Sequence, residues 1–403
     1  MPREVPPTAG LPLRWSDFFG GGELEPALRN FLGVNWLKVE CSGTACLIIA
    51  LRYLKSKSDR STVVVSGYTC PLVAIAVAQA GLKIQLCDTA PDSYDFNAGQ
   101  LEEQCNEDTL AIIVTHFGGL AADVAAARSV ADKVGAFLIE DNAQSLGAKL
   151  QGQPLGTMSD IGIFSLSAGK GLTIYQGGFM VASDPEVQSG LDKMSAELVR
   201  SNFLLEMYRT AELIGYGMFY SPDGMRYVYG DALRAQLAKG NRAQAVGDVF
   251  PLQTELARVG TLRKRVGASA INRLPAHVAA ARRQALQRVA TLKTVDGVKI
   301  LDEPDGCEGS WPFLTVVFAH EDDCEKTLAT LWAAGVGVTK LFVNSLTGYD
   351  YLAKIVPRTN IPNSDSFAAR TLTVSNSQWL SDSEFSFIVR TIQASVSCPK
   401  LNR

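Results

Sequence analysis

The sequence predicts an α/β protein with a mostly parallel, doubly wound sheet in a large domain, followed by a smaller α+β domain. Three observations support this class. Short apolar runs alternate with helical segments over the first half of the 403-residue chain, which is typical of parallel strands joined by helices. A helix-rich middle follows, and strands and helices mix again after residue 298. We expect an N-terminal arm over residues 1–22, a large domain over 23–250 and a small domain over 251–403.

The large domain begins after a Pro/Gly-rich arm that ends in three consecutive glycines. A short helix is expected at 23–31 and a strand at 36–40. The further expected strands lie at 62–65, 84–87, 110–114, 136–139, 161–166 and 179–182, and the helices between them at 45–54, 72–80 and 124–134. Ligands of such sheets bind at the carboxyl ends of the strands, so polar residues that follow these strands are the candidate site.

The middle of the chain is expected to be helical over residues 186–241. Its aromatic segment, residues 203–245, fits core packing, a substrate cover, a dimer contact or a peripheral membrane contact. Residues 256–292 form an arginine-rich amphipathic region that should break near Pro275 and expose its arginines. The small domain should contain strands at 313–318 and 371–374, and helices at 322–334 and 383–394.

Composition indicates an ordinary globular protein. Apolar residues make up 47% and charged residues 20%. The net charge of −3 shows no excess of positive charge of the kind that would indicate nucleic-acid binding. The eight cysteines include no CxxC pair, which favours reduced, buried thiols in a cytoplasmic protein. No signal peptide is expected. The uncharged run at 61–82 is divided by polar and turn residues, so membrane association is not expected.

The most informative stretch runs from residue 137 to 183. One apolar run ends in Glu140 and Asp141, and a second leads into a small-residue loop that carries Lys170. A lysine in a turn is usually solvated. Here the loop has almost no other charge and lies between two buried strands, so desolvation should lower the pKa of the amine. A neutral lysine amine suits Schiff-base chemistry, and an acid on a neighbouring strand suits protonation of a pyridine nitrogen.

Two further motifs follow strand ends. Ser42, Gly43 and Thr44 precede a buried helix, where backbone N–H groups can bind an anion or where Ser42 can act as a simple N-cap. With Lys170 and Asp141 present, phosphate binding is the better interpretation. His116 follows another strand, where it fits a structural or a functional role equally well.

Two other kinds of site are excluded by spacing. The sequence around Lys170 lacks a P-loop, because Phe164 stands where the first glycine belongs and Gly171 replaces the magnesium-binding hydroxyl residue. The three histidines are widely spaced, so no metal site is expected.

Five ordered blocks carry a family resemblance. They are Ser42-Gly43-Thr44-Ala45, Tyr68-Thr69, Asp88, Thr115-His116-Phe117-Gly118, and a long block with Asp141, Gln144, Gly147-Ala148, Phe164-Ser165, Lys170 and Gly177-Gly178. Together they resemble the DegT/DnrJ/EryC1/StrS family of fold-type-I, pyridoxal-phosphate-dependent sugar aminotransferases. The resemblance covers about residues 25 to 395.

The resemblance implies pyridoxal 5'-phosphate as the cofactor, Lys170 as the Schiff-base lysine and proton carrier, and Asp141 as the partner of the ring nitrogen. Gln144 would hydrogen-bond the ring oxygen. The implied reaction moves an amino group from an amino acid, by family habit glutamate, to a keto group of a nucleotide-linked deoxysugar or a related natural-product or polysaccharide precursor. The phosphate would be held by Ser165, Gly43 and Thr44.

The sequence departs from the family at three places. Cys70 replaces the aromatic residue that usually stacks on the cofactor ring, which leaves Tyr68 and His116 as candidates for that contact. The cross-subunit asparagine and arginine are missing from residues 247–251, and the sugar-site histidines are missing around residues 339–341. A non-sugar substrate and a non-catalytic, cofactor-binding regulatory or assembly protein therefore remain as alternatives. The family resemblance also implies a homodimer, and Lys170 in place of histidine favours transamination over dehydration.

Overall fold

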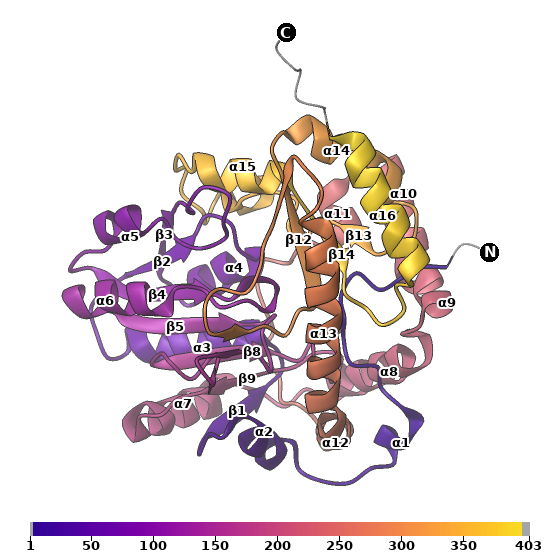
Figure 1. Cartoon of the computed structure of the whole chain (residues 1–403). Helices are drawn as coiled ribbons and strands as arrows, with labels where there is room; N and C mark the ends of the chain where they lie inside the picture. Colours follow the sequence, from indigo (N-terminus) through magenta and orange to yellow (C-terminus); the bar gives the residue numbers. More distant parts are fainter. Residues whose placement is uncertain (1–2, 397–403) are drawn as a thin grey trace.

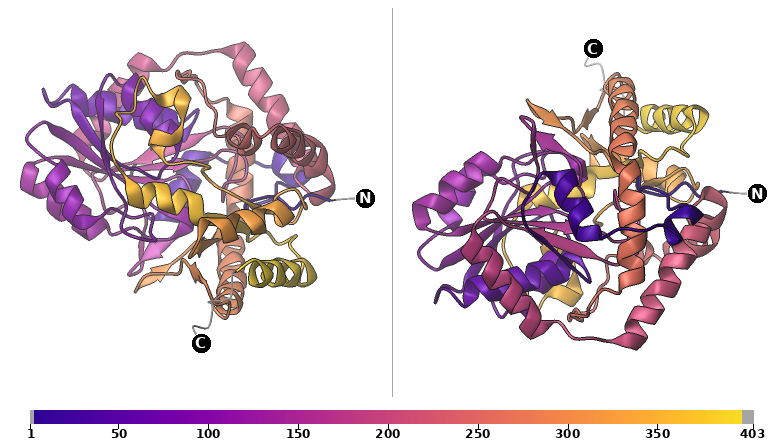
Figure 2. Two further views of the ribbon diagram at one scale, coloured as in Figure 1. Left: turned by 90° about the horizontal axis from the view of Figure 1, so that it is seen from above. Right: turned by 90° about the horizontal axis from the view of Figure 1, so that it is seen from below.

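The computed structural model describes residues 3–396. Figure 1 shows a large sheet with helices on both of its faces, beside a smaller sheet that is covered by α13 (Leu274–Leu292), α14 (Glu321–Leu331) and α16 (Asp382–Ser395). The right-hand view of Figure 2 shows α13 between the large sheet and α16.

The large sheet has seven strands in the order β1-β9-β8-β5-β4-β2-β3. The five central and edge strands from β8 to β3 are parallel, whereas β9 and β1 join antiparallel. The prediction of a mostly parallel, doubly wound sheet is confirmed. The strands are β1 (Leu37–Glu40), β2 (Thr62–Ser66), β3 (Lys83–Cys87), β4 (Thr109–Thr115), β5 (Phe137–Asn142), β8 (Ile161–Ser165) and β9 (Gly178–Val181).

Alternate side chains of these strands enter two cores. Val63 and Val65 pack with α3 (Gly43–Lys55), α4 (Pro71–Gln79) and α7 (Pro185–Leu198). Val64, between them, packs on the other face with α5 (Ala98–Gln104), α6 (Val124–Val134) and the small sheet. Because successive side chains of a strand point to opposite faces, one apolar run supplies both cores.

The small sheet is antiparallel, in the order β10-β12-β14-β13. Its strands are β10 (Val298–Ile300), β12 (Phe313–Phe318), β14 (Thr371–Ser375) and β13 (Val338–Thr339). Three short strands form a second small sheet: β6 (Lys149–Leu150), β7 (Gln153–Pro154) and β11 (Cys307–Glu308). Since β6 and β7 follow β5 in the chain whereas β11 follows β10, this sheet ties the two larger sheets together.

The helical middle consists of α8 (Phe203–Phe219), α9 (Pro222–Met225), the π-helical turn η2 (Arg226–Gly230), α10 (Asp231–Ala238) and α11 (Arg242–Val246). The N-terminal arm carries α1 (Trp15–Phe18), and α2 (Leu24–Leu32) follows the arm. The arm lies near α8, because a Cβ added to Gly217 would be 2.9 Å from the Phe18 ring. None of the helices in residues 3–396 is both long and apolar enough to cross a membrane.

The arginine-rich region breaks as expected. α12 (Thr261–Ala270) ends at a short turn, η3 (Ile271–Arg273), and α13 begins with Pro275 in its first turn. The prediction that its arginines are solvated is wrong for two of them, because the side chains of Arg263 and Arg288 are buried. Arg263 pairs with Glu206, and Arg288 donates to the backbone oxygens of Ser375 and Leu380.

The seven described cysteines are free thiols, and five of them are buried. Cys41 and Cys70 are half-buried. Cys398 lies outside the described residues.

Asp88 joins the large sheet to the small domain. It follows β3 and caps α15 (Pro362–Arg370), which precedes β14 in the chain. Its Oδ1 accepts from the N–H and the hydroxyl of Ser364, both at 2.7 Å, and its Oδ2 accepts from the N–H of Asn363 at 2.9 Å. The carboxylate is buried, so these contacts satisfy the first turn of a helix away from water.

We predict that Asp88→Ala lowers the free energy of unfolding by about 3 kcal/mol, because it leaves buried donors without an acceptor. Asp88→Asn, which keeps one acceptor oxygen, should cost less. Urea denaturation measures both, with the exposed Asp59→Ala as the matched control. A loss no larger than that of the control would contradict the role given to Asp88.

Candidate functional site

A cavity of about 760 Å³ lies at the carboxyl edge of the large sheet. Its walls come from the start of α3, the ends of β4, β5 and β8, α8, and the loops around residues 247 and 342. Of the residues predicted from the sequence, the structure brings together in this cavity Gly43, Thr44, Cys70, His116, Asp141, Gln144, Ser165 and Lys170.

Asp141 is placed by strand pairing. It lies near the end of β5, opposite Thr115 of β4 and Ile163 of β8. Its Oδ1 accepts a hydrogen bond from the N–H of Ala143 at 3.0 Å, and its Oδ2 has no partner among residues 3–396. Burial raises the pKa of the Asp141 carboxyl, although this N–H and the nearby Lys170 oppose the effect. The side chain is thus a buried carboxyl with one oxygen open to a donor.

Lys170 lies in the turn after β8. The turn closes through a hydrogen bond from its own N–H to the Ser167 oxygen at 3.2 Å, and Gly169 adopts a positive φ of 75° that favours glycine. The amine lines the same cavity as Asp141. Burial lowers the pKa of the amine, and Cys70 and Asp141 oppose this only in part. The direction of this pKa shift agrees with the direction expected from the sequence.

The N-terminal arm holds this turn from behind. The Thr8 hydroxyl donates to the Gly169 oxygen at 2.6 Å, and the Leu11 N–H donates to the Gly171 oxygen at 3.3 Å. Tyr220, which follows α8, donates its hydroxyl proton to the Thr8 oxygen at 3.1 Å. Nothing in the sequence near Lys170 indicates this support, because its residues come from distant parts of the chain.

The start of α3 forms one wall of the cavity. The Ser42 hydroxyl caps the helix by accepting from the N–H of Ala45 at 3.0 Å. The N–H groups of the first turn have no acceptor within the helix, so they can bind an anion. Gly178 of β9 permits the helix to approach, because an added Cβ would lie 2.3 Å from the Gly43 nitrogen. The Ser165 hydroxyl lies on the same cavity and donates to the Ser167 hydroxyl at 3.1 Å.

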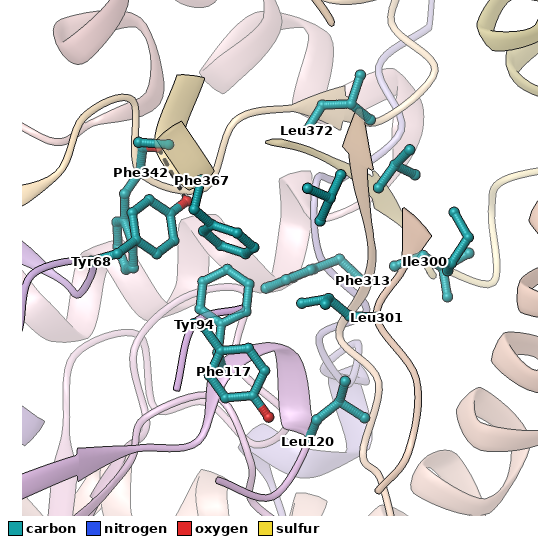
Figure 3. Close-up of a cluster of buried hydrophobic side chains, with 14 of the residues drawn as sticks. Tyr68, Tyr94, Phe117, Leu120, Ile300, Leu301, Phe313, Phe342, Phe367 and Leu372 are labelled. Atoms are coloured by element: carbon teal, nitrogen blue, oxygen red, sulfur yellow. Dashed lines mark hydrogen bonds between the residues drawn. The ribbon is translucent and has the colours of Figure 1, made fainter. Parts of the chain in front are cut away.

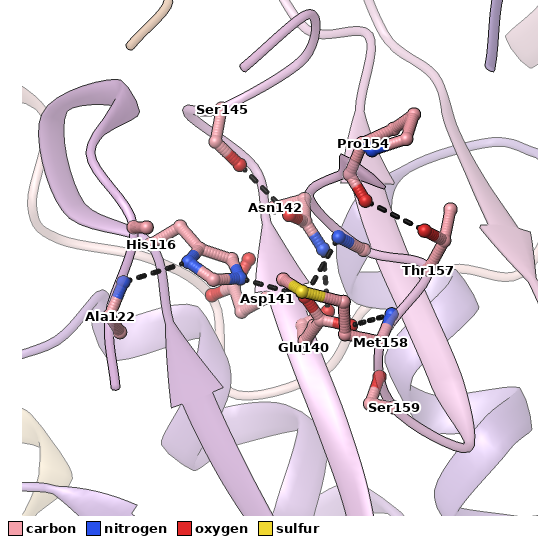
Figure 4. Close-up of polar contacts among 12 residues, drawn as sticks. His116, Ala122, Glu140, Asp141, Asn142, Ser145, Pro154, Thr157, Met158 and Ser159 are labelled. Atoms are coloured by element: carbon pink, nitrogen blue, oxygen red, sulfur yellow. Dashed lines mark hydrogen bonds and ion pairs between the residues drawn. The ribbon is translucent and has the colours of Figure 1, made fainter. Parts of the chain in front are cut away.

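His116 has a structural hydrogen-bond pattern, shown in Figure 4. Its Nδ1 accepts from the N–H of Ala122 at 3.1 Å, so its proton is on Nε2, which donates to Glu140 at 3.0 Å. Burial would raise the pKa of Glu140, but hydrogen bonds from His116 and from the N–H of Gly156 lower it overall. Both ring nitrogens are occupied, so neither is available to a ligand in the cavity.

The structure does not bring Tyr68 to the cavity. Figure 3 shows its ring in an apolar cluster, where it packs edge-on against Phe342 and Phe367. Its hydroxyl donates to the Phe342 oxygen at 3.3 Å. Gln144 does line the cavity, and its Oε1 accepts from the N–H of Gly118 at 2.8 Å.

Tyr175 and Arg209 also line the cavity, and no sequence signal singled them out. Asp248 and Phe250 line it too, from the 247–251 segment that the sequence marked only for its missing asparagine and arginine. Tyr175 lies five residues after Lys170 and has a positive φ of 69°, which is strained for a residue other than glycine. Arg209 lies on α8. Asp248 follows α11 and is considered below.

Comparison with known proteins gives consistent matches. Residues 21–218 match the DegT/DnrJ/EryC1/StrS aminotransferase family. Protein MosB of Rhizobium meliloti is 33% identical over 208 residues, which is 48% of this chain and 40% of that protein. A putative L-glutamine:3-amino-2,3-dideoxy-scyllo-inosose aminotransferase of Streptomyces kanamyceticus is 34% identical over 156 residues, 39% of this chain and 37% of that protein. The matched region thus spans about two fifths of the length of these relatives.

The fold itself matches over nearly the whole chain. The crystal structure of PseC from Helicobacter pylori, an aminotransferase involved in the biosynthesis of pseudoaminic acid, superposes with a TM-score of 0.75. It covers 97% of this chain and 99% of that chain, at 15% sequence identity. At this identity the likeness shows the fold alone. The expected fold-type-I aminotransferase architecture is confirmed.

We predict that the Lys170 amine titrates at lower pH than an ordinary lysine, because burial disfavours its charged form. Trace labelling of the protein with acetic anhydride at a series of pH values, read by mass spectrometry, measures this. Lys57 is the internal control, since its side-chain hydrogen bond with Glu186 raises its pKa. Labelling of Lys170 that rises only in step with Lys57 would contradict the prediction.

Proposed function

Through residues 21–218 this chain belongs to the DegT/DnrJ/EryC1/StrS aminotransferase family, and on this premise we propose that it is a pyridoxal-phosphate-dependent aminotransferase. The observation that supports the proposal best is the pair of Lys170 and Asp141 in one cavity. A lysine amine of lowered pKa and a buried carboxyl with an open oxygen are the two groups that this chemistry requires.

The residues present fit the cofactor. Asp141 Oδ2 lacks a partner among residues 3–396 and would accept from the ring nitrogen. The N–H groups at the start of α3 and the Ser165 hydroxyl line the same cavity and suit a phosphate. Cys70 offers no ring for stacking, and burial raises its pKa to about 12, so its thiol stays neutral. His116, which lines the cavity, remains the proposed residue for the stacking contact.

Each residue then has a defined task. When bound, pyridoxal phosphate supplies an electron sink for charge at the substrate carbon that carries nitrogen. Lys170 Nζ takes and returns a proton, and its burial shifts the amine toward the unprotonated form that takes the proton. Asp141 would hold a proton on the ring nitrogen, and Gln144 would be available to the ring oxygen from its place beside Gly118. Thr8 and Leu11 keep the Lys170 turn in position.

The substrates are proposed from the family and its members. The name of the Streptomyces kanamyceticus relative gives L-glutamine as the donor and an aminocyclitol ketone as the acceptor. The resemblance found in the sequence gives glutamate and a nucleotide-linked keto sugar. We propose one of these two amino acids as the donor and a keto sugar or keto cyclitol as the acceptor.

We predict that added pyridoxal phosphate gives the protein a visible absorption band that bleaches with glutamate or glutamine. Borohydride should fix the cofactor covalently on the peptide that contains Lys170, read by mass spectrometry. Lys170→Ala should lose both the band and the adduct, while Lys57→Ala, on the surface, keeps them. A wild-type protein without a band, or with the adduct on another lysine, would refute the proposed function. A band that neither amino acid bleaches would refute transamination with these donors.

A homodimer is proposed as the functional form. Apolar side chains form an exposed stripe along α8: Phe203, Met207, Ile214 and Met218, with Leu204 and Tyr208 beside it. Phe203 and Leu204 are 76% and 77% exposed. An apolar stripe of this length is expected to be covered. The other side of α8 lines the cavity through Leu205, Glu206 and Arg209, so a second copy on the stripe would adjoin the site.

We predict that Met207→Glu changes the wild-type dimer to a monomer, because a charge would be buried in the interface. Phe387→Glu, on the exposed side of α16, is the matched control and should remain dimeric. Size-exclusion chromatography with light scattering gives the mass of each. A monomeric wild type, or a dimeric Met207→Glu protein, would contradict the assignment of this face.

A further inference from the structure

Asp248 is a second buried carboxyl on the wall of the cavity. It follows α11 and the αL residue Gly247, and the residue is only 4% exposed. The proposed roles of Lys170 and Asp141 do not involve it. A buried carboxyl beside a site, without an assigned task, is a candidate for substrate recognition.

The contacts of Asp248 are unevenly shared between its oxygens. Oδ2 accepts from the N–H of Val343 at 2.9 Å and from the hydroxyl of Tyr349 at 2.6 Å. The backbone oxygen of Asp248 accepts from the hydroxyl of Tyr351 at 2.6 Å. Oδ1 has no partner among residues 3–396. Asp248 lines the cavity, and Oδ1 is the side-chain oxygen that the hydrogen bonds of the described residues leave open to a donor.

A carboxylate would not be needed at position 248 if the residue only connected its own loop to the 341–351 loop. An asparagine could accept the same two hydrogen bonds on its amide oxygen without burying a charge. Instead, burial raises the pKa of Asp248 to about 6, although Tyr349 and the Val343 N–H lower it in part. At neutral pH the group is therefore charged at the expense of stability, and it presents a strong acceptor to the cavity.

We propose that Asp248 Oδ1 accepts a hydrogen bond from a hydroxyl group of the keto substrate, so that the cavity prefers polyhydroxylated ketones to keto acids. The inference rests on the proposed function and adds a residue that determines acceptor specificity. A carboxylate binds a neutral hydroxyl by a charge-assisted hydrogen bond, and it repels a carboxylate that is placed at the same position.

The groups around Asp248 do not titrate near its own pKa. Burial raises the pKa of Cys70 and Tyr229 to about 12. The phenol pKa values of three other neighbours are raised still further, again by burial first. The neighbours are Tyr68, Cys70, Tyr229, Tyr349 and Tyr351. All stay neutral at pH 6. Lys170, Asp141 and the cofactor phosphate share the cavity and can also change charge with pH, so the loss of the pH dependence in Asp248→Asn is the result that identifies Asp248.

The direct test is binding of hydroxyl-rich probes to the protein loaded with pyridoxal phosphate. Calorimetry with UDP-N-acetylglucosamine and with scyllo-inositol, neither of which has a ketone, separates a nucleotide-sugar source of the hydroxyl from a cyclitol source. Asp248→Asn should weaken binding of the probe that the wild type accepts by about 10- to 100-fold. Asp365→Asn is the matched control, because Asp365 also contacts the 341–351 loop, through Ser345, but does not line the cavity.

The pH dependence gives a second readout that a structural role would not change. Probe affinity of the wild type should rise as pH increases through about 6, because Asp248 loses its proton there. Asp248→Asn should show no such rise. Tyr349→Phe, which removes one hydrogen bond to Oδ2, should keep the pH dependence and lose only part of the affinity. Thermal melting shows that each variant is folded.

Two results would overturn the inference: equal probe binding by Asp248→Asn and Asp365→Asn, or no binding of either probe by the wild type. Neither result affects the proposed pyridoxal-phosphate chemistry and amino donor, which are tested by bleaching of the cofactor band with an amino acid. In the enzyme assay, a rise in the KM for a keto sugar with an unchanged rate of bleaching supports the role given to Asp248. An equal loss in both half-reactions would contradict it.

Discussion

A buried amine beside a buried carboxyl is the constraint on which the rest of the structure depends. Each group alone would be driven by burial toward its neutral form, which is the direction of both pKa shifts. They meet because parallel strands end at one edge of a sheet, so that β5 delivers Asp141 and the turn after β8 delivers Lys170. The arm holds that turn through Thr8, and Gly178 lets α3 approach from the side. The order of the strands, the N-terminal arm and the start of α3 thus together form the cavity around Lys170 and Asp141.

Much of this site could be predicted from the sequence because its determinants are local. Apolar runs that end in polar residues predicted the strands and placed Asp141, Ser165 and Lys170 at their ends. The desolvation of Lys170 followed from an uncharged loop between buried strands, and its lowered pKa agrees. The break before α13 followed from Pro275, whose ring is compatible only with the first turn of a helix.

The features that the sequence did not predict depend on contacts between segments that are distant in the chain. The periodicity of apolar residues does not encode such contacts. Arg263 looked like a surface arginine until the fold brought Glu206 to it from α8. Tyr68 ends in an aromatic cluster because Phe342 and Phe367 come from the small domain. Asp248 lies next to Val249, which stands where the family resemblance places an asparagine, and only the structure shows that the 341–351 loop of the same chain contacts its carboxyl. Residues that adapt a common site to one substrate are drawn from such non-local contacts.

The most direct test of the central claim is a crystal structure of the protein grown with pyridoxal phosphate. The account predicts electron density that is continuous from Lys170 Nζ to the cofactor, with the ring nitrogen beside Asp141 Oδ2 and the phosphate at the start of α3. A cofactor bound elsewhere, or in this cavity without a link to Lys170 and with its ring nitrogen away from Asp141, would contradict it.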